Sequence, residues 1–89
     1  MPETTLKIQW PDRTEANYYS PSTVIHEYFK TGESYPVEEF LQLSRRAYQE
    51  ASDRVQAKFG MACTGASSSL AQIESDAQLQ SREELVVVL

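Results

Sequence analysis

Two residues of this chain have side chains that could act as a base or a nucleophile near neutral pH, and each residue type occurs once. They are the histidine His26 and the cysteine Cys63. A general base needs an orienting partner or a nucleophile within hydrogen-bond reach, and nothing in the sequence places these two together. We therefore expect His26 to be an exposed or edge-of-core histidine and Cys63 to pack as a small hydrophobic residue.

A second interpretation of Cys63 stays open. It precedes an expected helix, whose free amides could lower the pKa of its thiol, and the hydroxyl-rich run from Thr64 to Ser69 could lead into amides that hold an anion. That run lacks the glycine and lysine spacing of a phosphate-binding loop, and helix capping explains it more simply. A single cysteine forms neither an intrachain disulfide nor a thiolate metal cage. We predict no catalytic residue, no metal site and no cofactor, and we expect that the protein is not an enzyme.

Aromatic side chains are the more informative candidates for binding. The 89 residues include five tyrosines and one tryptophan, and such side chains combine a large contact area with a polar tip. Some of them must lie in the core, but an exposed patch shared by two or more would be a surface for a partner or for self-association. The residues that we single out for ligand or partner binding are Trp10, Tyr18, Tyr35, His26 and Cys63.

Cations along the middle of the chain favour an ordinary charged surface. Arg46, Glu50 and Arg54 are spaced four residues apart, as expected for a solvated helix face with ion pairs. Arg45 and Lys58 belong to the same stretch. A binding role for this face is the alternative, and a salt-bridged surface is the simpler interpretation.

Charge and hydropathy exclude two classes of partner. Thirteen acidic residues against eight basic ones give a net charge of -5, which repels a phosphate backbone, so we expect no nucleic acid partner. The longest apolar run, Leu85 to Leu89, is far shorter than the roughly 20 residues that cross a bilayer. Residues 1–10 show no export signal, and the lone cysteine fits a reducing compartment. We expect a cytoplasmic protein without a membrane partner.

The N-terminal part predicts a β-hairpin. Thr5 to Trp10 alternates apolar and polar residues, with the period of a half-buried strand. Pro11 and Asp12 supply turn chemistry, and Thr14 to Tyr19 is the returning strand. An isolated hairpin is marginally stable, so helices must pack on its apolar face.

Three helices are predicted after the hairpin. Ser20 and Pro21 favour the start of the first, and Gly32 can end it. Ser34, Tyr35 and Pro36 start the second in the same way. Its apolar residues recur every three or four positions up to Phe59, and Gly60 is its stop.

A linker of small and hydroxyl residues is predicted from Met61 to Ser69. The third helix follows it and directs Leu70, Ile73 and Ala77 toward the core. This helix is shorter and its periodicity is weaker.

The fold class is therefore α+β, with an N-terminal β-hairpin packed on three helices in the order ββααα, the second helix being long. We assign residues 1–80 to a single domain and 81–89 to a C-terminal tail. Two outcomes for the tail stay open. Leu85 to Leu89 could add a third strand beside the hairpin, or it could be disordered.

Five short segments occur together in one order, and they carry a family resemblance. They are Trp10-Pro11-Asp12, Tyr19-Ser20-Pro21-Ser22, Ser34-Tyr35-Pro36 with Phe40, Ala51-Ser52 with Arg54-Val55, and Ala57-Lys58-Phe59-Gly60 with Ala62-Cys63. In order and spacing they resemble a family of small nitrogen starvation response proteins of mycobacteria, cyanobacteria and other bacteria. The resemblance spans roughly residues 5–75 and leaves Leu85 to Leu89 outside. Arg13 stands where we expect the family to carry glycine, which leaves the turn type open.

The resemblance implies a pathway and no particular reaction. Genes of that family lie beside those of a nitrilase, a radical SAM enzyme, an acetyltransferase-like protein and a flavoprotein, a cluster linked to nitrile or cyanide nitrogen assimilation. The expected function is a non-catalytic accessory or regulatory protein of nitrogen starvation, acting by contact with a nitrilase-cluster protein or with itself.

Two further functions stay open. One is a small-molecule-binding module or minor enzyme with a pocket near His26 and Cys63. The other uses Leu85 to Leu89 to add a strand to the sheet of a neighbouring molecule.

Overall fold

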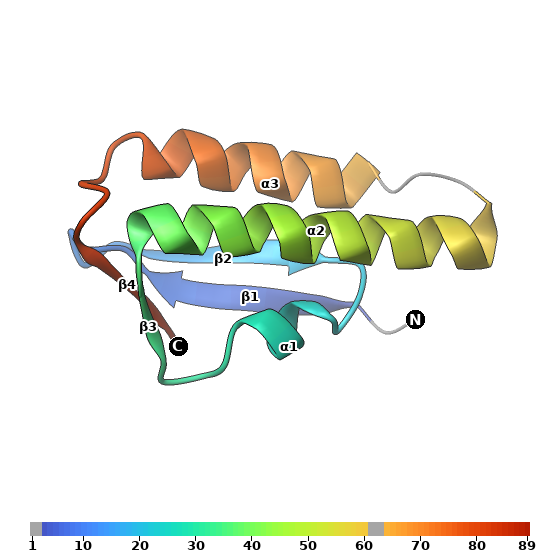
Figure 1. Ribbon diagram of the computed structural model, residues 1–89, viewed down its shortest axis with the longest axis horizontal. Coiled ribbons are helices and arrows are strands. Elements are labelled where there is room, and N and C mark those ends of the chain that lie inside the picture. Colours follow the sequence, from blue (N-terminus) through green and yellow to red (C-terminus); the bar gives the residue numbers. More distant parts are fainter. Residues whose placement is uncertain (1–2, 61–63) are drawn as a thin grey trace.

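A computed structural model describes residues 3–60 and 64–89 of the chain. Its elements follow the order β1 (Thr4–Gln9), β2 (Glu15–Ser20), α1 (Ile25–Tyr28), β3 (Ser34–Pro36), α2 (Val37–Phe59), α3 (Thr64–Ala77) and β4 (Leu85–Val88). The strands form one antiparallel sheet in the order β2-β1-β4-β3, and α2 and α3 lie side by side along it (Figure 1). The predicted α+β class with a long second helix is confirmed.

The predicted hairpin is present, and its turn contains an unusual backbone. β1 pairs with β2 from Thr4 opposite Ser20 to Gln9 opposite Glu15. The Arg13 amide donates to the Trp10 carbonyl at 2.8 Å, and Arg13 has a φ of 73°. This left-handed conformation is the one that glycine adopts without steric cost. Arg13 therefore occupies a position with the backbone geometry of a glycine.

The first helix is much shorter than predicted. It comprises only Ile25–Tyr28, because the serines before it use their hydroxyls in turns. Ser20 Oγ donates to the Ser22 carbonyl at 2.7 Å, and Ser22 Oγ accepts from the Val24 amide at 3.3 Å. Gly32, expected to end the helix, instead donates its amide to the Val88 carbonyl at 2.8 Å. The segment after the hairpin is thus mainly a connection to the far side of the sheet.

Strands β3 and β4 complete the sheet. Ser34–Pro36, predicted to begin a helix, pairs with β4 so that Tyr35 lies opposite Val86. The other side of β4 pairs with β1, with Ile8 opposite Val88. The first of the two outcomes for the tail is therefore the observed one. Because both edges of β4 are paired within the chain, the hypothesis that this segment adds a strand to a neighbour's sheet is wrong.

Helix α2 agrees with its predicted limits. Val37, Phe40 and Tyr48 are among the residues that it buries in the core. It ends at Gly60, which has a φ of 73° and donates its amide to the Gln56 carbonyl at 2.7 Å. A left-handed glycine at this position satisfies a carbonyl that the last turn would otherwise leave free.

Helix α3 begins earlier than predicted, at Thr64. The residues expected to form a linker up to Ser69 are therefore helical from Thr64 on. Ser69 is buried, as are Ile73 and Ala77, while Leu70 is half-buried. The small residues allow α3 to pack closely beside α2.

Aromatic rings connect the two ends of the core. Trp10 meets Phe40 edge to face, with ring centroids 5.6 Å apart. The ring centroids of Phe40 and Phe29 are 5.0 Å apart. Phe29 meets Tyr35 edge to face, with ring centroids 5.7 Å apart. Such contacts add to the free energy gained by burial alone.

Candidate functional site

Two of the five predicted site residues lie together. Trp10 Nε1 donates to Tyr18 Oη at 3.1 Å, and Tyr18 Oη donates to Asp76 Oδ2 at 2.6 Å. Trp10 and Tyr18 are only 3% and 4% exposed. Burial, followed by the hydrogen bond to Asp76, raises the pKa of Tyr18 above its ordinary value, so it remains a neutral donor. This buried network joins the hairpin to α3 and offers little surface to a partner.

A pocket of about 310 Å³ adjoins this network. It lies between the hairpin turn and the end of α3, and its lining includes Trp10, Asp12, Asp76 and Leu79. Hydrogen bonds from the Thr14 amide, and then from the Gln80 side chain, lower the pKa of Asp12. The lining therefore combines carboxylates with apolar surface.

The other predicted residues lie elsewhere. Tyr35 is half-buried, and its hydroxyl donates to the Tyr28 carbonyl at 3.4 Å. His26 is exposed, as expected, and its Nε2 lies 2.7 Å from Thr4 Oγ1. Cys63 lies outside the described residues, and the pocket predicted near His26 and Cys63 is not among the three described above and below, none of which includes His26 in its lining. The four predicted site residues that the structure describes thus do not lie in one place.

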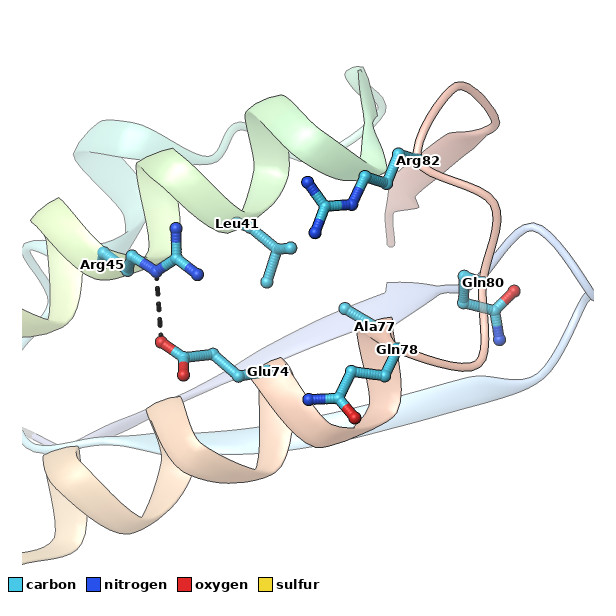
Figure 2. A pocket seen from close by; sticks show the side chains of 7 residues that line it. All are labelled: Leu41, Arg45, Glu74, Ala77, Gln78, Gln80 and Arg82. Atoms are coloured by element: carbon cyan, nitrogen blue, oxygen red, sulfur yellow. Dashed lines mark hydrogen bonds and ion pairs between the residues drawn. The ribbon is translucent and has the colours of Figure 1, made fainter.

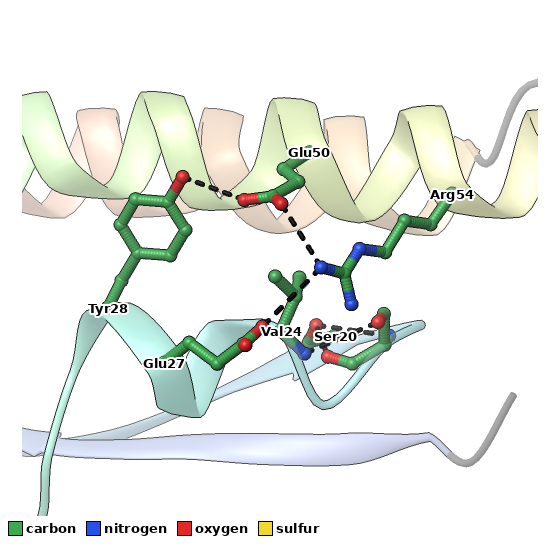
Figure 3. A network of polar contacts seen from close by, with 7 residues as sticks. Ser20, Val24, Glu27, Tyr28, Glu50 and Arg54 are labelled. Atoms are coloured by element: carbon green, nitrogen blue, oxygen red, sulfur yellow. Dashed lines mark hydrogen bonds and ion pairs between the residues drawn. The ribbon is translucent and has the colours of Figure 1, made fainter.

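Glu50 and Arg54 of the predicted salt-bridged face form an ion pair, and a tyrosine that the sequence did not single out binds the same glutamate. Arg54 Nη2 lies 3.2 Å from Glu50 Oε1 and 3.6 Å from Glu27 Oε2. Tyr28 Oη donates to the other oxygen of Glu50 at 2.7 Å (Figure 3), and this bond is the main cause of a raised pKa at Tyr28. These contacts connect α1 to α2. Because the side chains are largely exposed, each ion pair contributes at most about 1 kcal/mol.

A second pocket, of about 260 Å³, lies between α2, α3 and the loop that leads into β4. We call it the arginine groove; its lining residues are Leu41, Arg45, Glu74, Ala77, Gln78, Gln80 and Arg82 (Figure 2). Arg45 Nε donates to Glu74 Oε1 at 3.2 Å. No pattern in the sequence indicates this pocket, because its residues come from three segments that only the fold brings together.

Two buried hydroxyls lie one helical turn apart on α2. Within residues 3–60 and 64–89, neither Ser44 Oγ nor Tyr48 Oη has a hydrogen-bond partner of acceptable geometry. Burial raises the pKa of Tyr48, and the nearby Ser69 hydroxyl opposes this rise. A cavity of about 60 Å³ adjoins Tyr48. It is large enough for water and too small for an organic substrate.

The sheet face opposite the buried core side chains carries an apolar stripe. Leu85, Val87 and Leu89 alternate with the buried Val86 and Val88 along β4 and its end. We call these three outward residues the β4 stripe. Leu85 is 53% exposed, Leu89 is 43% exposed and Val87 is half-buried. This group of aliphatic side chains at the surface is a candidate contact surface.

Polar residues flank the β4 stripe on both sides. The register places Gln9 of β1 and Ser34 of β3 opposite Val87, and the Leu89 amide donates to the Lys7 carbonyl at 2.9 Å. An apolar centre with a polar margin is the usual composition of a protein contact surface.

Neither a metal cluster nor a membrane span is found in the part of the chain that the structure describes. No three histidine, cysteine, aspartate or glutamate residues gather there as metal ligands would. None of the described helices has the length and apolarity that crossing a membrane requires.

Comparison with protein families gives a match over most of the chain. Neither the curated proteins nor the solved structures include a significant match to this chain. A family model described as nitrogen starvation-induced protein NitG matches residues 5–89. The match extends beyond residue 75, where the resemblance was expected to end, and it includes β4. This chain therefore belongs to the family of the nitrogen starvation-induced protein NitG.

Proposed function

We propose that this protein is a non-catalytic accessory or regulatory protein of the nitrogen starvation response, and that it acts by contact with another protein. The observation that carries the proposal is the β4 stripe on the open face of the sheet. Covering apolar surface stabilises a complex by about 25 cal/mol per Å² removed from water. A partner that covers Leu85, Val87 and Leu89 would gain this free energy.

The position of the stripe makes it suitable for specific contact. β4 is held between β1 and β3 by backbone hydrogen bonds, so its outward side chains are presented by a rigid support. A preorganised surface loses little conformational entropy when it binds. Lys7 on the neighbouring strand is exposed and could select a partner with a complementary acidic group.

The non-catalytic part of the proposal is supported by where the titratable side chains lie. His26 contacts the Thr4 hydroxyl at the surface, at a different place from Asp76, which belongs to the network with Tyr18. Within the described residues no carboxylate forms an ion pair with His26, and a general base needs such a group to orient it.

We also propose that the partner is encoded in the nitrilase gene cluster that the family resemblance implies, with a second copy of this chain as the alternative. Family membership supports a role in nitrogen starvation. A reducing cytoplasm is the location that fits a chain with one cysteine.

Affinity capture from nitrogen-starved cells tests this function. The tagged wild-type protein should recover a nitrilase-cluster protein, identified by mass spectrometry, or a second copy detected by sedimentation. The double variant Leu85→Glu with Leu89→Glu should reduce the recovery roughly tenfold or more, since it places two charges in the contact.

Leu79→Glu is the matched control. Leu79 is 84% exposed and lies in the loop after α3, away from the β4 stripe, so its variant should recover the partner as the wild type does. Equal recovery by the double variant would refute contact through the stripe. Recovery of no partner together with a monomeric protein would refute the proposed function.

A further inference from the structure

The arginine groove concentrates positive charge on an acidic protein. Its lining includes two arginines and one glutamate, whereas the whole chain has a net charge of -5. Figure 2 shows the guanidinium groups of Arg45 and Arg82 on either side of Leu41, both directed into the groove. Opposed guanidinium groups around one space are suited to a ligand with negative charge at both ends.

Arg45 keeps donors available for such a ligand. Its Nε atom binds Glu74 Oε1 at 3.2 Å, which fixes the guanidinium plane across the gap between α2 and α3. A guanidinium has five N–H donors, so the two Nη groups remain able to bind a carboxylate side by side. Glu74 therefore orients Arg45 and at the same time reduces the positive potential of the groove.

Arg82 is positioned by its backbone. The Glu38 amide at the start of α2 donates to the Arg82 carbonyl at 3.2 Å, and the Val37 amide donates to the Glu84 carbonyl at 2.9 Å. These bonds hold the loop against the positive end of the helix dipole. Arg82 forms no ion pair with any of the residues that the structure describes. Carboxylates in the first turn of α2, at Glu38 and Glu39, offset part of this charge.

Two aliphatic side chains contribute to the lining of the groove. Leu41 is half-buried and lies between the guanidinium groups in Figure 2, and the buried Ala77 lines the groove from α3. This apolar surface favours a ligand with methylene groups between its charges, since burial of those groups stabilises binding. A compact inorganic anion would leave the surface uncovered.

We propose that the arginine groove binds a short aliphatic dicarboxylate. One carboxylate binds the Nη groups of Arg45 and the other binds Arg82, while the methylenes lie over Leu41 and Ala77. The volume of about 260 Å³ accommodates a molecule of this size. The groove lies on the helix side of the sheet, whereas the β4 stripe lies on the opposite face. This site therefore does not depend on the proposed protein contact.

Calorimetric titration of the full chain with glutarate at low ionic strength tests the site. We expect saturable binding of one glutarate per chain and a rise in the thermal midpoint, because the ligand binds the folded state. Propionate, which has one carboxylate, and inorganic phosphate, which has no methylenes, should each bind roughly tenfold more weakly. Absence of saturable binding at millimolar glutarate would overturn the proposal, and so would equal affinity for phosphate.

Three variants separate the groove from general charge effects. Arg82→Gln and Arg45→Gln should each weaken glutarate binding roughly tenfold. Arg46→Gln is the matched control, since Arg46 is an exposed arginine of the same helix outside the lining. Equal weakening by Arg46→Gln would show attraction to net charge alone and would overturn the site.

Glu74→Gln should change the affinity for glutarate in the opposite direction to the arginine variants. It removes the one carboxylate among the lining side chains but keeps a side chain of the same shape, so glutarate should bind several-fold more tightly than to the wild type. A purely structural role of Glu74 predicts unchanged or weaker binding. Weaker binding in a variant with an unchanged thermal midpoint would contradict the assignment.

Discussion

At the scale of single residues, the role of a side chain depends on its backbone conformation and on its hydrogen-bond partners. Arg13 has a φ of 73° in the hairpin turn, at the position where the family resemblance leads us to expect glycine. The sequence suggests Trp10 and Tyr18 as binding residues, yet both are buried. Trp10 donates a hydrogen bond to Tyr18, and Tyr18 donates one to Asp76 of α3. The sequence showed the aromatic types but could not show this carboxylate, because the contact exists only in the folded chain.

Arg13→Gly should stabilise the protein. A non-glycine residue in the left-handed region costs roughly 1–2 kcal/mol, and the greater entropy of glycine in the unfolded chain cancels about 0.5–1 kcal/mol of the gain. The free energy of unfolding should therefore rise by about 0.5–1 kcal/mol, which urea denaturation measures. The comparison variant Arg46→Gly, in a helix, should lower it by about 1 kcal/mol. Destabilisation by both variants would contradict this account of the turn.

At the scale of elements, the strongest periodicity gave the most accurate prediction. Helix α2 has the expected limits because its apolar spacing and its Gly60 cap agree. Ser20-Pro21 and Ser34-Tyr35-Pro36 carry the same local signal for a helix start, yet β2 ends at Ser20 and the second segment forms β3. Their conformation depends on distant partners such as Val86, and local propensity contains no information about these partners.

Truncation after Glu84 should abolish cooperative folding. β4 lies between β1 and β3, and its removal takes the buried Val86 and Val88 out of the core and leaves backbone groups of both neighbours without partners. Each unpaired buried group costs about 1–3 kcal/mol, which is large relative to a total stability of about 5–15 kcal/mol.

Circular dichroism during thermal unfolding measures the effect of the truncation. The shortened chain should show a broad, non-cooperative transition, while the full chain should show a sharp one. A sharp transition at an unchanged temperature would mean that β4 is dispensable and would contradict its central place in the sheet.

At the scale of the whole molecule, the sheet separates two surfaces. The helix side contains the aromatic core and the arginine groove, and the other face presents the β4 stripe. The sequence showed the apolar run from Leu85 to Leu89 but not that alternate residues of it face solvent. That property depends on a sheet covered on one side only, as antiparallel sheets commonly are. The fold class can therefore be predicted from the sequence, whereas the two candidate surfaces can be identified only from the structure.

Site-specific photo-crosslinking in nitrogen-starved cells tests the proposed contact most directly. A photoreactive amino acid replaces Val87, at the middle of the β4 stripe, or Leu79, which is exposed in the loop after α3. The account predicts one defined covalent adduct from position 87, containing a nitrilase-cluster protein or a second copy of the chain, and no such adduct from position 79. No adduct at position 87, or the same adduct at both positions, would contradict it.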